Sequence, residues 1–166
     1  MGTRISFTRP DGKQAEGYLA RSGKANALGV VVIQEWWGLQ DQIKGVCDRL
    51  ALAGYDALAP DLFNGTVIPY HDTEAAGVAM NSLNFVEATD QPVRGAAQFL
   101  LKSSPKVAIC GFCMGGFLLG ALNACQRPNS QCTLPSGQIT RHSPSVGNPV
   151  SSACLINATA FARSSG

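Results

Sequence analysis

The feature that most constrains the fold is an apolar run ending in a Gly-x-Cys-x-Gly turn, Val107-Ala-Ile-Cys-Gly-Phe-Cys-Met-Gly-Gly116. Four apolar residues suit a buried parallel strand, and glycines at 111 and 115 remove the Cβ atoms that would clash where a strand turns sharply into a helix. Such a turn is a nucleophile elbow, and it would present the sulfur of Cys113 at the carboxyl edge of a sheet. The alternative is a buried structural thiol, because free cysteine is among the most buried residues.

The segments before the elbow alternate between strand and helix patterns. Arg4–Phe7 and Glu16–Ala20 flank a Pro-Asp-Gly turn and predict an antiparallel hairpin. Leu28–Ile33 and Asp56–Ala59 predict buried strands, and the helical spacing of apolar residues between them ends at Gly54. This order predicts a parallel α/β sheet, in which ligands bind beyond the carboxyl ends of the strands.

The rest of the chain has weaker patterns. Residues 61–84 form a less regular region, and a helix is expected to start near Asp90, with one apolar face made by Val93, Ala96, Ala97 and Leu100. Small polar and turn-forming residues dominate the carboxyl-terminal segment, so we expect a largely disordered tail in which only Leu155–Phe161 docks. The predicted division is an α/β domain over residues 1–122 and a Ser/Pro/Gly-rich tail over residues 123–166.

Composition and charge exclude several classes of partner. The net charge of +2 and the absence of a basic block argue against nucleic acid and anionic membranes. The amino terminus lacks the apolar core of a signal peptide, and no apolar stretch is long enough to span a bilayer, so we expect a cytoplasmic location. The six cysteines are then expected to be free thiols, and neither their spacing nor that of the two histidines predicts a metal or cofactor.

Three segments carry a specific resemblance. Gly29-Val-Val-Val-Ile-Gln-Glu-Trp-Trp-Gly38, Leu52-Ala-Gly-Tyr-Asp-Ala-Leu-Ala-Pro-Asp-Leu-Phe-Asn-Gly65 and Gly111-Phe-Cys-Met-Gly-Gly116 resemble, in order and spacing, the landmark segments of the dienelactone hydrolase family of α/β-hydrolases, also called carboxymethylenebutenolidases. The resemblance covers about residues 1–120. It implies a three-layer α/β-hydrolase fold and a hydrolase of small-molecule carboxylic esters or lactones.

The resemblance also suggests roles for individual residues. It implies that Cys113 attacks the carbonyl to form a thioester and that Glu35 helps to deprotonate the thiol. The helix expected to begin near Met114 would favour the thiolate, and the backbone N–H groups of Met114 and Trp36 would form the oxyanion hole. Trp36 and Trp37 would wall the substrate pocket. The alternatives are an ion-paired Glu35 at a strand end and tryptophans that belong to the core.

The chain departs from the family after the elbow. Family members complete a Cys-His-Asp triad from later strands, whereas this chain has no carboxylate after Asp90 and only His142 in that region, within a Ser/Pro context. His71 lies between Tyr70 and Asp72, where a loop or helix-start position with Asp72 as the N-cap is the expected role. The sequence does not decide whether His71 or His142 substitutes for the triad base.

Two hypotheses for function stay open. One is a hydrolase with a cysteine nucleophile, impaired by the missing partners; the other is a catalytically inactive, truncated variant that acts as a binding or regulatory chain. A third class, thiol–disulfide exchange by Cys110 and Cys113, is disfavoured because Cys110 falls inside the apolar strand.

The elbow strand would lie at the sheet edge if the last three strands of the family fold were absent. Family topology runs 1-2-4-3-5-6-7-8, so three parallel strands, a hairpin edge and about four helices are expected. An uncovered apolar edge invites aggregation, self-association through pairing with another chain, or covering by the tail.

Overall fold

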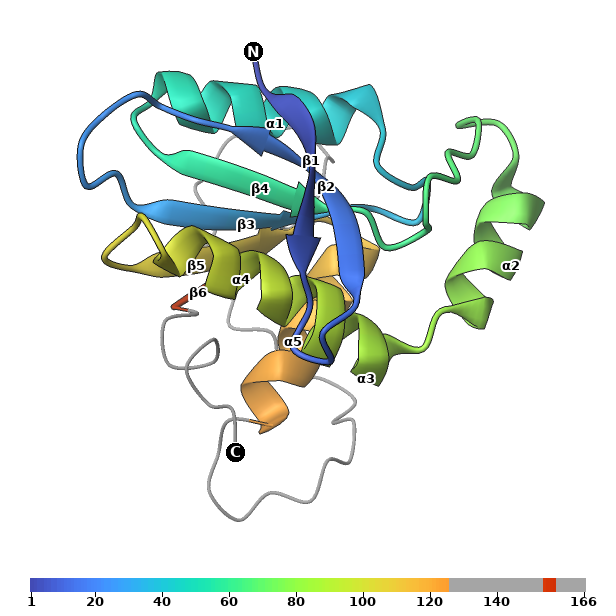
Figure 1. Cartoon of the computed structure of the whole chain (residues 1–166). Helices are drawn as coiled ribbons and strands as arrows, with labels where there is room; N and C mark the ends of the chain where they lie inside the picture. Colours follow the sequence, from blue (N-terminus) through green and yellow to red (C-terminus); the bar gives the residue numbers. More distant parts are fainter. Residues whose placement is uncertain (126–153, 158–166) are drawn as a thin grey trace.

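The computed structural model of the chain describes residues 1–125 and 154–157. One sheet runs through the domain in the order β1-β2-β4-β3-β5-β6, with helices on both faces (Figure 1). The strands are β1 (Thr3–Thr8), β2 (Gln14–Ala20), β3 (Gly29–Ile33), β4 (Asp56–Pro60), β5 (Val107–Gly111) and β6 (Cys154–Asn157). The helices are α1 (Asp41–Leu52), α2 (Thr73–Ser82), α3 (Phe85–Ala88), the π-helical turn η1 (Thr89–Val93), α4 (Arg94–Leu101) and α5 (Met114–Cys125).

The centre of the sheet is the predicted set of parallel strands. β3 pairs in parallel with β4 on one side and with β5 on the other. The predicted hairpin is also confirmed, because β1 and β2 pair antiparallel and β2 continues the sheet by pairing antiparallel with β4. This order matches the first five strands of the expected topology.

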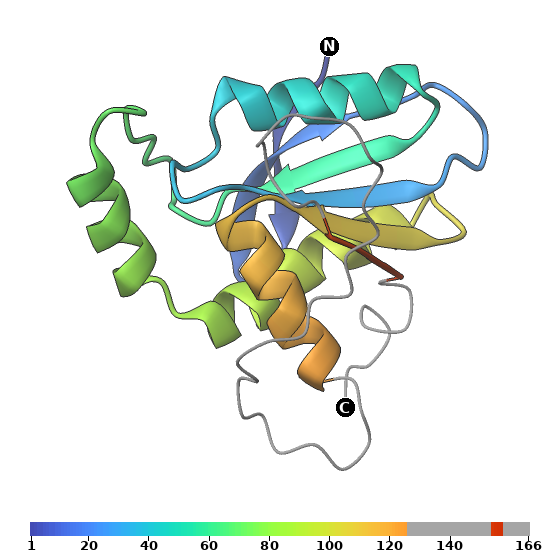
Figure 2. The same ribbon diagram turned by 180° about the vertical axis from the view of Figure 1, so that it is seen from behind.

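Apolar residues cover both faces of the parallel strands, as their continuous apolar sequences require. Val31, Ile33 and Ile109 pack on the face covered by α4 and α5. Val30, Val32 and Cys110 alternate with them and pack on the opposite face, against Ile43 and Cys47 of α1. Figure 2 shows α1 and α5 on opposite sides of the sheet, which gives the three-layer arrangement.

The region before the elbow is more helical than its sequence predicts. The segment expected to be irregular contains α2, which Asp72 caps by accepting a hydrogen bond from the Ala75 backbone N–H at 3.0 Å. The helix expected to start near Asp90 begins instead at Phe85. Asn84 caps it by accepting from the Glu87 backbone N–H at 3.1 Å.

Pro92 explains why the pattern around Asp90 resembled a helix start. Proline favours first turns of helices, but here it lies inside η1, where the helix widens at a residue that has no N–H to donate. The predicted apolar face beyond it is confirmed, since four residues are fully buried: Val93, Ala96, Ala97 and Leu100.

The outer edge of β5 is not open along its length. β6 pairs with it antiparallel, from Ala108 opposite Asn157 to Gly111 opposite Cys154. The expectation of an exposed elbow strand is therefore wrong for these positions. Instead, β6 from the carboxyl-terminal segment covers the edge of β5. Hydrogen bonding explains it, because an apolar edge strand leaves main-chain groups that another strand can satisfy.

The predicted tail lies mostly outside the described residues. α5 extends to Cys125, past the expected boundary at residue 122, and β6 overlaps the start of the segment Leu155–Phe161 that was expected to dock. The prediction of a disordered tail falls on residues outside the described part. Within the described part, none of the helices has the length and apolar character needed to cross a membrane.

Candidate active site

The turn between β5 and α5 has the strained backbone of an elbow. Cys113 adopts a φ of 51°, in the left-handed region that non-glycine residues rarely occupy. A Cβ at Gly111 would collide with the backbone of Gly115, and a Cβ at Gly115 would lie 2.8 Å from the Ile33 carbonyl oxygen. Both glycines are therefore required by close backbone approach. The predicted strand, turn and helix are present, and Cys113 is exposed at the turn.

The loop that follows β3 lies next to this elbow. Ile33 and Gly111 are register partners in the parallel pair β3–β5, so Glu35 and Cys113 each stand two residues beyond a paired position. Gly115 in the first turn of α5 also approaches the backbone oxygens of Ile33 and Gln34. The fold thus brings together the two segments that carry the predicted catalytic residues.

Glu35 is a partly buried carboxylate in the loop after β3. Burial raises the pKa of its carboxyl group. Among residues 1–125 and 154–157, no lysine, arginine or histidine forms an ion pair with Glu35. The alternative of a charge-paired residue at a strand end is therefore not what the described residues show. A partly buried carboxylate that is not neutralised by a neighbour is unusual outside functional sites.

Three aromatic rings contact one another in the two loops that follow β3 and β4. The rings of Trp36 and Trp37 meet edge to face with centroids 5.0 Å apart, and those of Trp37 and Tyr70 do so at 5.5 Å. Trp36 and Trp37 are half-buried and pack against the core, as the alternative for the tryptophans expected, while their role as pocket walls stays a prediction. The sequence did not single out Tyr70, because only the fold brings its loop to the loop that carries Glu35 and Trp37.

Main-chain and amide hydrogen bonds hold these two loops together. The Ile68 N–H donates to the Trp37 carbonyl at 2.9 Å, and Gln40 Nε2 donates to the Ile68 carbonyl at 2.7 Å. Gly38, with a φ of 87°, packs so close to the Thr66 carbonyl that a Cβ would collide with it. The segment before Tyr70 is therefore fixed against the segment after Glu35.

Gln34 is a second residue that the sequence did not single out. It is fully buried between the Glu35 loop and the end of β4, where its Oε1 accepts from the Leu62 N–H at 3.2 Å. Its Nε2 has no hydrogen-bond partner among the described residues. Only its position just after β3 could have pointed to Gln34 in the sequence, because an uncharged amide does not stand out in the pattern of charged residues.

The other described cysteines differ from Cys113. Cys110 is buried in β5, where burial raises the pKa of its thiol to about 11. Cys47 is buried in α1 and burial raises its pKa to about 12. Thiols with such values are almost entirely protonated at neutral pH. The position of Cys110 inside the strand agrees with the argument against thiol–disulfide exchange.

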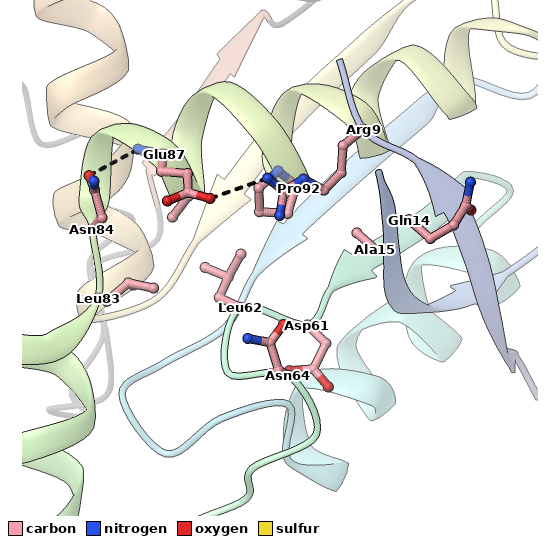
Figure 3. A pocket seen from close by; sticks show the side chains of 11 residues that line it. Arg9, Gln14, Ala15, Asp61, Leu62, Asn64, Leu83, Asn84, Glu87 and Pro92 are labelled. Atoms are coloured by element: carbon pink, nitrogen blue, oxygen red, sulfur yellow. Dashed lines mark hydrogen bonds and ion pairs between the residues drawn. The ribbon is translucent and has the colours of Figure 1, made fainter. Parts of the chain in front are cut away.

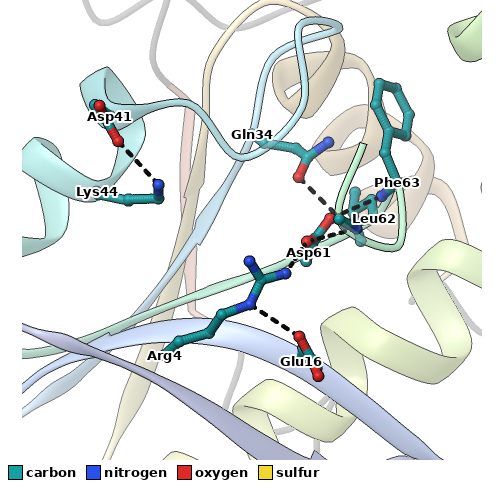
Figure 4. Close-up of polar contacts among 9 residues, drawn as sticks. Arg4, Glu16, Gln34, Asp41, Lys44, Asp61, Leu62 and Phe63 are labelled. Atoms are coloured by element: carbon teal, nitrogen blue, oxygen red, sulfur yellow. Dashed lines mark hydrogen bonds and ion pairs between the residues drawn. The ribbon is translucent and has the colours of Figure 1, made fainter. Parts of the chain in front are cut away.

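The remaining candidates are structural or lie elsewhere. His71 is exposed in the loop before α2, and no described interaction joins it to Cys113. His142 lies outside the described residues. Asp61, which follows β4, caps the next turn: it accepts from the Phe63 and Gly65 N–H groups at 3.1 and 2.9 Å and pairs with Arg4 at 2.9 Å (Figure 4).

A cavity of about 150 Å³ lies apart from the elbow. It is bounded by the β1–β2 hairpin, the turn after β4 and α3 (Figure 3). Its charged groups are already neutralised, because Arg9 pairs with Asp11 and Glu87 while Asp61 pairs with Arg4. None of the predicted site residues lines it, so we do not assign it to the candidate active site.

The sheet order, the two helical layers and the elbow define the class: this is an α/β-hydrolase fold. The model of the "Dienelactone hydrolase family" matches residues 15–135. The chain therefore belongs to the dienelactone hydrolase family. The fold and the sequence resemblance agree on this point.

Relatives and solved structures agree with that assignment. The chain is 36% identical over 127 residues to "Protein usf" of Aquifex pyrophilus, covering 71% of this chain and 53% of that protein. It is 33% identical to a "Putative carboxymethylenebutenolidase" of Aquifex aeolicus, with the same coverage. The structure of a "Putative Dienelactone Hydrolase" from Klebsiella pneumoniae superposes with a TM-score of 0.62 at 26% identity, over 76% of this chain and 56% of that one. The chain thus spans about half the length of the curated relatives it matches.

Proposed function

We propose that this chain carries the nucleophile half of a carboxylic ester or lactone hydrolase, with Cys113 as the attacking group. The observation that supports this most strongly is the contrast among its thiols. Cys113 is exposed on a strained elbow, whereas Cys47 and Cys110 are buried with raised pKa values. A strained turn costs stability and persists where it positions a reactive group.

The proposed reaction has two steps. In the first, the Cys113 thiolate attacks the carbonyl carbon of the ester, and the tetrahedral intermediate expels the alkoxide, which takes a proton, leaving a thioester. In the second, water attacks the thioester carbonyl and releases the carboxylic acid and the thiol. A lactone reacts in the same way, except that its alcohol stays attached to the acyl group.

Glu35 is proposed as the group that accepts the thiol proton. Its carboxylate is partly buried, its pKa is raised, and its loop packs on the elbow through Ile33 and Gln34. A base whose pKa is moved toward neutrality is better matched to a thiol than an ordinary carboxylate. The N–H groups of Trp36 and Met114 are the proposed oxyanion donors, since the first follows Glu35 and the second begins α5.

The second step would lack its usual catalytic partners among the described residues. No described residue has the position of a triad histidine or its orienting acid, and loss of such partners costs several orders of magnitude in rate. The chain would then acylate once and turn over slowly. The alternative function is a catalytically inactive binding or regulatory chain, which the absence of these partners from the described site favours.

Burst kinetics distinguish the two functions. The chain is mixed with 4-nitrophenyl acetate, and the released nitrophenolate is followed beside Cys113→Ala and the control Cys110→Ala. The hydrolase proposal predicts a burst near one equivalent per chain, followed by slow turnover, and a mass increase of one acetyl group on the peptide with Cys113. The burst is expected to vanish in Cys113→Ala and to persist in Cys110→Ala. Equal traces for the parent chain and Cys113→Ala would leave only the binding function.

A further inference from the structure

The candidate site carries negative charge from Glu35 and Asp41. Burial raises the pKa of the Tyr70 phenol, and the negative charges of Glu35 and Asp41 raise it further. Asp41 itself is paired with Lys44 at 2.9 Å. Among the described residues, no ion pair joins a lysine or arginine to Glu35.

The rings of Trp36, Trp37 and Tyr70 form a continuous aromatic wall, in which Trp37 contacts the other two. The ring planes meet at large angles: 64° between Trp36 and Trp37, and 74° between Trp37 and Tyr70. Rings at such angles cannot all stack on one flat group, but they can surround a compact one. The electron-rich faces of tryptophan and tyrosine attract cations, and cages of such rings recognise quaternary ammonium groups.

We propose that Glu35, Trp36, Trp37 and Tyr70 bind the positively charged part of a substrate, of the trimethylammonium class. This rests on the proposed function in one respect: it takes the Glu35 loop as the wall of the substrate pocket. Glu35 supplies the opposite charge, the tryptophans supply the ring faces, and Tyr70 is the specificity-determining residue that closes the wall from the facing loop. Esters that carry an ammonium group are therefore preferred over neutral esters of the same shape, and anionic esters bind most weakly.

Tyr70 is held in place well enough to serve this role. Its hydroxyl forms a hydrogen bond with Gln42 Oε1 at 3.2 Å, and the adjoining backbone is fixed through Ile68 to Trp37. About half of the residue is exposed, at 52%. An anchored ring with an open surface is available to a ligand without rearrangement of the loop.

The test uses binding rather than turnover. The only two tryptophans of the chain are Trp36 and Trp37, so all of its tryptophan emission arises from the proposed wall. Emission is titrated at pH 8 and low ionic strength with choline, with its uncharged isostere 3,3-dimethyl-1-butanol, and with anionic 3,3-dimethylbutanoate. We expect choline to bind about tenfold more tightly than the isostere and the anion to bind more weakly still. Equal affinities, a preference for the anion, or no change in emission with any of the three would overturn the proposal.

Variants separate the contribution of each group. Tyr70→Leu and Glu35→Gln are each expected to weaken choline severalfold while leaving the isostere nearly unchanged, and Tyr70→Phe should keep the preference because it keeps the ring. Tyr55→Leu is the matched control, because Tyr55 is also a partly exposed tyrosine but lies just before β4, away from the site. An unchanged choline preference in both Tyr70→Leu and Glu35→Gln would contradict the assignment.

Failure of this proposal is distinguishable from failure of the proposed function. The titration is repeated with Cys113→Ala, which cannot form a thioester. Cation preference without an acylation burst would support the aromatic wall and leave a binding chain. A burst without cation preference would support the hydrolase and overturn the wall.

Discussion

Two neighbouring parallel strands are each followed by an acidic residue, and the two carboxylates differ in their burial and in their hydrogen-bond and ion-pair partners. Asp61 follows β4, is buried, and is engaged by Arg4 and two backbone N–H groups (Figure 4). Glu35 follows β3, is only partly buried, and has no ion-pair partner among residues 1–125 and 154–157. Both are acidic residues at the carboxyl edge of the sheet, where ligands bind in α/β folds.

The difference in bonding partners indicates that Asp61 is the structural carboxylate. A carboxylate whose oxygens already accept hydrogen bonds from the protein stabilises the fold and has little acceptor capacity left for a ligand. A carboxylate kept partly buried without a partner costs stability, and such a cost is retained where a ligand or a reaction uses the group. Position at the sheet edge alone does not separate the two, but the hydrogen-bond partners do.

The largest expected effect comes from breaking the contact that joins the Glu35 loop to the elbow. Gly115→Ala would place a Cβ 2.8 Å from the Ile33 carbonyl and 3.0 Å from the Gln34 carbonyl, and neither backbone can move freely. We expect a loss of about 3 kcal/mol or more in the free energy of unfolding, measured by urea denaturation. Gly77→Ala on α2 is the control; its Cβ meets nothing within 4 Å, so it should gain about 0.5–1 kcal/mol. Equal effects in both variants would contradict the close packing.

The next effect tests Asp61. Asp61→Ala removes the acceptor for the Phe63 and Gly65 N–H groups and the partner of Arg4, so the free energy of unfolding should fall by about 2–4 kcal/mol. Urea denaturation measures it. Glu16→Ala, which removes the exposed partner of the same arginine, should cost less than about 0.5 kcal/mol. A similar cost for both would show that the network around Asp61 does not carry the structural role.

A smaller effect of opposite sign is expected at Glu35. Glu35→Gln removes an ionised group that burial disfavours, so stability at pH 8 should rise, by less than about 1 kcal/mol. The acylation burst at Cys113 should fall in the same variant if Glu35 takes the thiol proton. A fall in stability comparable with that of Asp61→Ala would make Glu35 a structural residue and remove the contrast.

The smallest effect is the pH dependence of that stabilisation. Because the folded protein raises the pKa of Glu35 above its ordinary value of 4.5, the folded state is penalised while Glu35 is ionised and is relieved as pH falls through the folded pKa. The stability difference between Glu35→Gln and the parent chain should therefore be largest at pH 7–8 and shrink toward zero near pH 4. A difference that stays constant over this range would exclude titration of Glu35 as its cause.

Much of this architecture could be predicted from the sequence because it rests on short-range signals. The continuous apolar runs of β3, β4 and β5 and the glycines around Cys113 each have one physical explanation, and the structure agrees with all of them. The start of the helix at Phe85 was missed because Pro92 gave a competing signal. β6 could not be assigned a partner, since edge pairing depends on which main-chain groups are left open.

Only those residues of the candidate site that come directly after a strand could be predicted from the sequence. Cys113, Glu35 and the two tryptophans stand directly after strands, so their edge of the sheet could be deduced. Tyr70 reaches Trp37 through a loop whose path is set by the hydrogen bonds of Ile68 and Gln40, and no local pattern encodes that path. The lack of a partner for Glu35 is likewise a property of the assembled fold.

The place of β3 in the sheet also sets the order in which the site can be assembled. Both of its neighbours, β4 and β5, come later in the chain, so β3 emerges from the ribosome before either partner exists. Its main chain gains its first parallel neighbour when residues 56–60 emerge and its second only with residues 107–111. Parallel pairings between distant segments form slowly. The elbow strand is therefore the later of the two parallel neighbours to become available to β3, and a chain that ends before residue 111 would leave one side of β3 without its full partner.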